Sequence, residues 1–313
     1  DRFTRKWLVD EKFYVDTFVG ERGNEWLAKA APKDKSWFCC ISFPGPHMPY
    51  DGIGLPDNEQ YKDEEIDLPL TEYSDIKTKP EMYEMMFKTG HGSGCPEPIA
   101  GMTKDEARLV RRSYYANMSL IDRKIGQIIE TLKKSGEYDN TLIIYTSDHG
   151  DFMADFGMIG KGQYLAEVIM RVPFLIKPPV AGFKGRRDES FISNVDIAAT
   201  CLSVAGMEKP DDMSSVDLSS HWISSNPENR EFSYCEAAQM RSIRDRNWKL
   251  VHYRDREYGE LYHISEDPWE KKNLWDDSAC AQEKNRLSRK LVDCMMKIEP
   301  RADIRWNKRS PEW

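Results

Sequence analysis

The 313-residue sequence lacks the features of two large classes of protein. It has no run of about 18 apolar residues and its mean hydropathy is −0.68, so no segment is typical of a transmembrane helix. It also has no excess of basic residues, because 53 Asp and Glu outnumber 45 Lys and Arg and give a formal charge of −8. Since a nucleic-acid binder normally presents a basic face, this balance argues against nucleic-acid binding.

The seven cysteines also lack any regular spacing. Their number is odd, none belongs to a C-x-x-C pair, and Cys39 and Cys40 are adjacent in an apolar stretch. Disulfide frameworks normally use an even number of cysteines, and structural zinc sites use closely spaced pairs such as C-x-x-C. We therefore expect free thiols, which favour a reducing compartment. A missing signal peptide carries no information on localisation, because the sequence does not begin with Met.

The residues that are present predict a mixed α/β fold over residues 1–225. An apolar run at 36–43, ending at Pro44, predicts a strand buried on both faces. Thr103 and Glu106 have the spacing of a capping box, and apolar residues follow at intervals of three and four up to Gly136, which predicts a long helix. The sequence also predicts two further strands and one helix, at 141–146, 172–176 and 194–204. Helices that lead into strands predict a largely parallel sheet flanked by helices.

Residues 226–313 show a different pattern. Apolar stretches at 240–243, 248–253 and 260–264 are separated by polar turns, which predicts antiparallel strands. A helical pattern then runs from Ala279 to Ile298 and stops at Pro300. We expect a small antiparallel α+β subdomain.

Four polar residues follow predicted strands or lie in glycine-rich loops, where α/β proteins place ligands. Asp148 and His149 come directly after the strand at 141–146, and together they have the donors for a divalent cation. His47 lies in a proline-rich loop after the strand at 36–43, and Lys161 lies between two glycines, so either side chain could face an anion. From these residues alone, a structural role stays open for each of them. Asp148 could cap the turn that follows it, and His47, His149 and Lys161 could be ordinary surface side chains.

The motifs that contain these residues resemble, in the same order, those of the sulfatase family of the alkaline-phosphatase superfamily. The similarity includes residues 42–51 (SFPGPHMPYD), 145–151 (YTSDHGD), 160–161 (GK) and 171–173 (RVP). It extends to the carboxyl-terminal part at 241–250 and 260–274. The resemblance implies an alkaline-phosphatase-like fold and metal-dependent hydrolysis of sulfate esters.

The resemblance also implies a role for each candidate residue. Asp148 and His149 match the second pair of metal ligands, His47 matches the histidine that contacts the sulfate and protonates the leaving oxygen, and Lys161 matches the lysine that neutralises sulfuryl oxygens. The implied cation is calcium first, with manganese or zinc as alternatives because an imidazole is softer than an oxygen ligand.

Two parts of the family pattern are absent from the sequence. The paired metal-binding aspartates of the family's first strand are missing, and so is the C/S-x-P-S-R motif whose Cys or Ser becomes formylglycine. Cys95 does not substitute for that nucleophile, because the Pro and Arg of the motif do not follow it. The sequence therefore resembles the later part of a sulfatase, with no nucleophile in this chain, and formylglycine is expected only in a segment that precedes it.

Three functions remain open at this point. The first is a sulfatase that acts on a small-molecule or glycan sulfate ester. The second is a phosphodiesterase or phosphonate monoester hydrolase of the same superfamily, and the third is a noncatalytic protein that binds anions or glycans. Neither the oligomeric state nor the organic half of the substrate can be deduced from the sequence.

Overall fold

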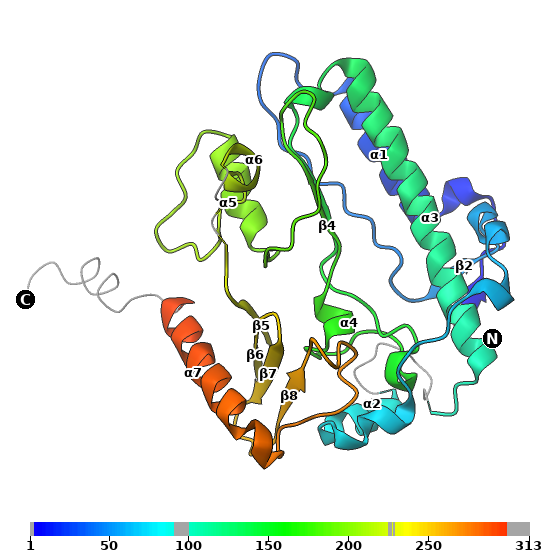
Figure 1. Cartoon of the computed structure of the whole chain (residues 1–313). Helices are drawn as coiled ribbons and strands as arrows, with labels where there is room; N and C mark the ends of the chain where they lie inside the picture. Colours follow the sequence, from blue (N-terminus) through cyan, green and yellow to red (C-terminus); the bar gives the residue numbers. More distant parts are fainter. Residues whose placement is uncertain (1–2, 91–99, 225–226, 228, 299–313) are drawn as a thin grey trace, which may run out of the picture.

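The computed structural model describes residues 3–90, 100–224, 227 and 229–298. Figure 1 shows helices and short strands up to α6, followed by a four-stranded sheet with one long helix. The described α-helices are α1 (Val15–Lys29), α2 (Glu81–Thr89), α3 (Lys104–Ser135), α4 (Glu167–Met170), α5 (Asp196–Val204), α6 (Ser220–Ile223) and α7 (Ala281–Ile298). The described strands are β1 (Thr4–Lys6), β2 (Tyr50–Ile53), β3 (Ile143–Thr146), β4 (Phe174–Lys177), β5 (Ser233–Ala237), β6 (Met240–Arg244), β7 (Trp248–Tyr253) and β8 (Gly259–His263).

Helix α3 forms where the sequence predicts it. The Thr103 hydroxyl accepts the Glu106 N–H at 3.2 Å, and the Glu106 carboxylate accepts the Thr103 N–H at 2.7 Å, which completes the capping box. Gly136 ends the helix in the left-handed region, at φ 77°. The helix is the longest element of the molecule as described, and α1 lies along it (Figure 1).

Helix α1 has no counterpart in the prediction. It contains Gly20 and Gly23, which weaken helix propensity. Packing explains why a glycine occupies position 20, because a Cβ there would lie 2.7 Å from the Cβ of Lys124 in α3. The glycine therefore permits the close approach of α1 and α3.

Strand pairing in the first part differs from the prediction. β1 and β2 are parallel, but β3 and β4 are antiparallel, with Ile143 opposite Lys177 and Thr146 opposite Phe174. A parallel pair needs a crossover connection, usually a full helix, whereas the segment between β3 and β4 contains a 3-10 turn at Asp155–Gly157 and the one-turn helix α4 but no longer helix. The α/β class is confirmed, while the described strands do not form a largely parallel sheet.

The strand predicted at residues 36–43 is not formed. No strand is assigned there in the described chain, although side chains alternate as in a strand. Trp37, Ile41 and Phe43 pack against a cluster around Leu27, whereas Phe38 is 77% exposed. A strand is defined by backbone hydrogen bonds to a neighbour, and the described residues offer none to this segment.

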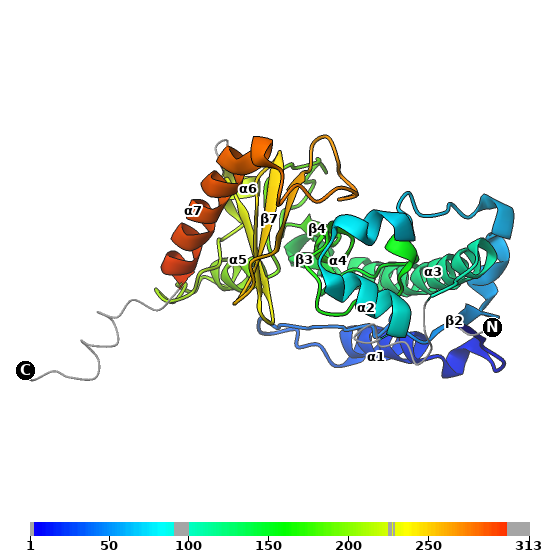
Figure 2. The ribbon, with the colours of Figure 1, turned by 90° about the horizontal axis from the view of Figure 1, so that it is seen from below.

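The carboxyl-terminal sheet follows the predicted hairpins. Its four strands are antiparallel in the order β5-β6-β7-β8, with β5 as an edge strand that the sequence did not predict. Leu287 and Leu291 of α7 pack on the face that carries Ile243, Leu250 and Leu261. Figure 2 shows α7 covering that face.

The opposite face of this sheet packs against the first part of the chain. Leu165 joins a buried cluster with Met240, Val251 and Tyr253. Beside this cluster, Glu270 accepts the Glu167 N–H at the start of α4 (2.9 Å) and the Lys249 ammonium (2.7 Å). Apolar packing and the hydrogen bond from the Glu167 N–H to the buried Glu270 therefore join the two parts.

The part of the chain that the structure describes contains neither a disulfide nor a helix that could span a membrane. The six cysteines within it are all unpaired, as predicted, and Cys95 lies outside it. Among the same residues, no helix combines the length and apolarity needed to cross a bilayer.

Candidate functional site

The turn after β3 is held in place by its neighbours. Asn194 donates to the Ser147 carbonyl at 2.8 Å and accepts the Thr146 hydroxyl at 3.0 Å. The Gly150 N–H donates to the Ile169 carbonyl at 2.7 Å, and a Cβ on Gly150 would lie 2.0 Å from the Val168 carbonyl oxygen. The backbone therefore passes so close to α4 that only glycine fits at position 150.

Asp148, His149 and Lys161 meet at this turn. The Lys161 ammonium lies 2.7 Å from His149 Nε2, and Asp148 Oδ2 lies 3.3 Å from the same nitrogen. The Asp148 side chain is 81% exposed and the His149 side chain 29% exposed, so the group faces the surface. Three of the four candidate residues are thus in direct contact.

The neighbours of His149 indicate which ring nitrogen carries the proton. Nδ1 lies 2.8 Å from the Gly150 carbonyl oxygen, which can only accept, so Nδ1 is the donor. A neutral ring then has a lone pair on Nε2, directed at Lys161. This is the form in which histidine binds a metal ion.

The fourth candidate, His47, lies in a loop that is anchored at both ends. At its start, the Gly45 N–H donates to Asp16 at 2.9 Å, and Asn117 of α3 donates to Asp16 at 3.0 Å. At its end, the Tyr50 hydroxyl donates to Asp151 at 2.8 Å. The His47 ring is exposed and has its Nδ1 2.7 Å from the Met48 carbonyl oxygen.

Asp151 connects these segments, and the sequence analysis did not assign it a role. Its carboxylate accepts hydrogen bonds from the Tyr50 hydroxyl, the Met153 N–H and the Gly160 N–H. Burial raises the pKa of Asp151, while these hydrogen bonds and the nearby charge of His47 lower it in part. The structure gives no hydrogen bond or ion pair between the His47 ring and Asp148, His149 or Lys161 in the described part of the chain, so His47 is not in direct contact with the other three candidates. The missed signal was in the motifs themselves, since Tyr50 and Asp151 are polar residues within 42–51 and 145–151.

The donors at the turn fit part of a divalent-cation site. Two oxygen or nitrogen ligands at right angles around calcium are roughly 3.4 Å apart, given bonds of about 2.4 Å. The separation of 3.3 Å between Asp148 Oδ2 and His149 Nε2 agrees with that value. Within the described ranges, no group of three or more His, Cys, Asp or Glu side chains is placed to hold a metal ion. Asp148 and His149 are thus a pair of donors within those ranges, and Lys161 would have to move away from Nε2 to admit an ion between them.

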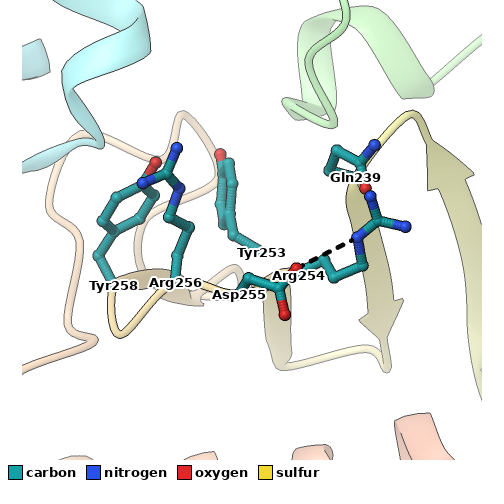
Figure 3. A pocket seen from close by; sticks show the side chains of 6 residues that line it. All are labelled: Gln239, Tyr253, Arg254, Asp255, Arg256 and Tyr258. Carbon is teal, nitrogen blue, oxygen red and sulfur yellow. Dashed lines mark ion pairs between the residues drawn. The ribbon is translucent and has the colours of Figure 1, made fainter.

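A separate hollow of about 550 Å³ lies at the turns of the carboxyl-terminal sheet, and none of the four candidate residues lines it. Figure 3 shows two guanidinium groups around it, and Arg254 pairs with Asp255 at 3.6 Å. The lining residues are Gln239, Tyr253, Arg254, Asp255, Arg256 and Tyr258.

Comparison with known families assigns the chain. The model described as Sulfatase matches residues 1–207, which include all four candidate residues and Asp151. The chain belongs to the sulfatase family. A second model, described as N-sulphoglucosamine sulphohydrolase, C-terminal, matches residues 155–297.

Curated relatives of this sulfatase chain are distant and longer. It is 28% identical over 242 residues to an N-acetylglucosamine-6-O-sulfatase of Bacteroides thetaiotaomicron, a match that covers 71% of this chain and 43% of the relative. It is 30% identical over 253 residues to a choline-sulfatase of Rhizobium meliloti, covering 77% of this chain and 46% of the relative. The chain thus spans about half the length of the curated relatives that it matches.

Solved structures show the same fold. A phosphonate monoester hydrolase from Silicibacter pomeroyi superposes with a TM-score of 0.80 at 21% identity, covering 94% of this chain and 62% of that one. A protein solved in complex with its substrate D-glucosamine-2-N,6-O-disulfate has a TM-score of 0.75 at 20% identity, covering 92% of this chain and 71% of that one. These matches confirm the alkaline-phosphatase-like fold.

Proposed function

We propose that this chain is the later part of a metal-dependent sulfuric ester hydrolase and provides one side of its active site. The contact of Asp148, His149 and Lys161 at the end of β3 is the observation that carries the proposal. These residues come from two separate motifs of the family, and the fold brings them within hydrogen-bond distance. An ordinary surface turn would not need a carboxylate, an imidazole and an ammonium together.

The chemistry follows from the charge that develops in sulfate ester hydrolysis. As the ester S–O bond breaks, negative charge grows on the sulfuryl oxygens and on the leaving oxygen. Lys161 would stabilise the sulfuryl oxygens, and His47 would bind the sulfate and donate a proton to the leaving oxygen. A divalent cation held by Asp148 and His149 would supply further positive charge at the sulfuryl group.

We further propose that the nucleophile, a formylglycine, belongs to a segment outside this sequence. Two exposed apolar side chains support this proposal, since Phe38 is 77% exposed and Leu175 of β4 is 66% exposed. Residues 36–43 alternate like a strand and pack against the same apolar cluster as Ile143 of β3, yet have no strand partner among the described residues. An additional strand would provide hydrogen-bond partners for the backbone of this segment and would cover the apolar side chains. Under this proposal, residues 1–225 form a partial sulfatase domain and 226–313 a subdomain.

The metal and the substrate can be proposed only by class. Calcium ranks first, and manganese or zinc remain possible because of the imidazole ligand. The substrate would be a small-molecule or glycan sulfate ester. A glycan is favoured by the match of residues 155–297 to a family named for an N-sulphoglucosamine hydrolase.

The main alternative is phosphonate monoester hydrolysis, which the structural likeness to such an enzyme keeps open. The test compares hydrolysis of an aryl sulfate and an aryl phosphonate monoester by the full-length product of the gene. We expect faster turnover of the sulfate. In the Asp148→Ala and Lys161→Ala variants we expect kcat/KM to fall about 100-fold or more, as when one oxyanion donor is removed.

Matched controls are the exposed residues Asp211 and Lys104, whose alanine variants should retain full activity. Preference for the phosphonate would favour the alternative. A full-length product without the C/S-x-P-S-R motif and without turnover of either substrate would favour a noncatalytic anion-binding protein.

A further inference from the structure

One carboxylate contacts all three segments that carry the candidate site. Asp151 lies two residues after His149, and its Oδ1 accepts the Gly160 N–H at 3.0 Å, next to Lys161. Its Oδ2 accepts the Tyr50 hydroxyl at 2.8 Å, three residues after His47. The Gly160 N–H also donates to the Tyr50 hydroxyl oxygen at 3.1 Å. Tyr50, Asp151 and Gly160 thus form a closed triangle of hydrogen bonds.

Two members of this triangle, Tyr50 and Gly160, are buried, and Asp151 is half-buried. Tyr50 is 2% exposed and belongs to the main apolar cluster of the molecule, with Phe152 and Ile159. No basic side chain forms an ion pair with Asp151 among the residues that the structure describes, so its partners are one hydroxyl and two backbone N–H groups. A half-buried carboxylate without an ion-pair partner is stabilised mainly by its hydrogen bonds, so the loss of one of them should be felt at the site.

We propose that Asp151 is a positioning residue, which fixes the loop of His47 and the backbone of Lys161 relative to His149. The inference rests on the proposed function, because holding these side chains in place matters only if they act together at one active site. Lys161 and His149 also contact each other directly, whereas no hydrogen bond or ion pair joins His47 to either residue within the described ranges. The bond between Tyr50 and Asp151 is therefore the link between the His47 loop and the segments of His149 and Lys161, while Asp16 holds the other end of the loop.

The test uses histidine ring signals in NMR spectra of this chain, which contains only 6 histidines. Tyr50→Phe removes the hydroxyl from the triangle. Asp151→Asn replaces one of the two acceptor oxygens with an NH2 group, so the side chain can no longer accept both the Tyr50 hydroxyl and the two backbone N–H groups in the present arrangement. Tyr164→Phe is the matched control, because its buried hydroxyl donates to the Met82 carbonyl in the same apolar cluster but outside the triangle. Equal losses of thermal stability in the two phenylalanine variants would make their spectra directly comparable.

We expect Tyr50→Phe and Asp151→Asn to shift the His47 and His149 signals, with the larger change at His47, and Tyr164→Phe to leave both in place. Unchanged signals in Tyr50→Phe, or equal shifts in Tyr164→Phe, would overturn the proposal. If Asp151→Asn does not fold, Tyr50→Phe decides alone.

Titration with sodium sulfate separates this inference from the proposed function. In the wild type, sulfate should shift the His47 signal, and Tyr50→Phe should need about tenfold more sulfate for the same shift. No response of the wild type to sulfate would count against the anion site, while the shifts caused by the variants would still decide the role of Asp151.

Discussion

Gly150 shows how one missing side chain permits the candidate site. A methyl group there would overlap the Val168 carbonyl, which is only 2.0 Å from the ideal Cβ position, so the backbone of the turn or of α4 would have to move. We predict that Gly150→Ala lowers the free energy of unfolding by about 1–3 kcal/mol, the usual cost of overpacking. Urea denaturation measures this loss.

Gly126 provides the control for that substitution. It lies inside α3 with open space around its Cβ position, so Gly126→Ala should stabilise the protein by roughly 0.5–1 kcal/mol. If Gly150→Ala and Gly126→Ala changed the unfolding free energy equally, the close approach of the backbone at Gly150 would not affect stability.

At the scale of elements, the loop of residues 44–51 depends on α1 and α3. Asp16 is fully buried and accepts hydrogen bonds from the Gly45 N–H and the Asn117 amide. Asp16→Ala would leave the Gly45 N–H unpaired, and the Asn117 amide would keep only its bond to the Tyr14 hydroxyl, so we predict a loss of about 2 kcal/mol in unfolding free energy. Asp105→Ala, at a carboxylate that is 95% exposed and pairs with Arg108, should cost less than about 1 kcal/mol. A smaller loss in Asp16→Ala than in Asp105→Ala would contradict this account of the loop.

The elements that the sequence predicted are those determined by local signals. The capping box of α3, its apolar periodicity and Gly136 all lie within one stretch of chain, as do the hairpins of the carboxyl-terminal sheet. Helix α1 was missed because its glycines suit tertiary packing against Lys124 rather than helix propensity. The strand at 36–43 was wrongly predicted because its composition is that of a strand, while pairing depends on a neighbour.

For the candidate site, the sequence supplied the residues but not their connections. Motif order pointed to His47, Asp148, His149 and Lys161 through a family resemblance. The bond between Tyr50 and Asp151 joins positions 101 residues apart, and only the folded chain shows it.

At the scale of the whole molecule, Lys249 joins the carboxyl-terminal sheet to the first part of the chain. Its buried ammonium lies 2.7 Å from Glu270 and 3.2 Å from Glu167. Burial lowers the pKa of Lys249, but the two carboxylates outweigh this and hold the pKa above its ordinary value of 10.5. A raised folded-state pKa means that the stabilisation is complete below pH 10.5 and is lost as the pH rises through the folded-state value.

We therefore predict that Lys249→Met costs about 3 kcal/mol at pH 7, because the buried Glu270 carboxylate loses its ion-pair partner, while Glu167 keeps its pair with Arg244. The difference in unfolding free energy from the wild type should shrink as the pH rises above about 10.5. Urea denaturation at pH 7, 9 and 11 tests this, with exposed Lys271→Met as the control. A difference that is constant with pH would show that the ammonium charge is not what stabilises the contact.

The central claim is that this chain carries two ligands of a sulfatase metal site and lacks the rest. Calorimetric titration of the chain with calcium, and in parallel with manganese, tests it beside Asp148→Ala and the control Asp211→Ala. Because most of the ion's coordination would be left to water, we predict weak binding, with a dissociation constant on the order of 10⁻³ M, that Asp148→Ala abolishes and Asp211→Ala preserves. Tight binding that is unaffected by Asp148→Ala would contradict the claim.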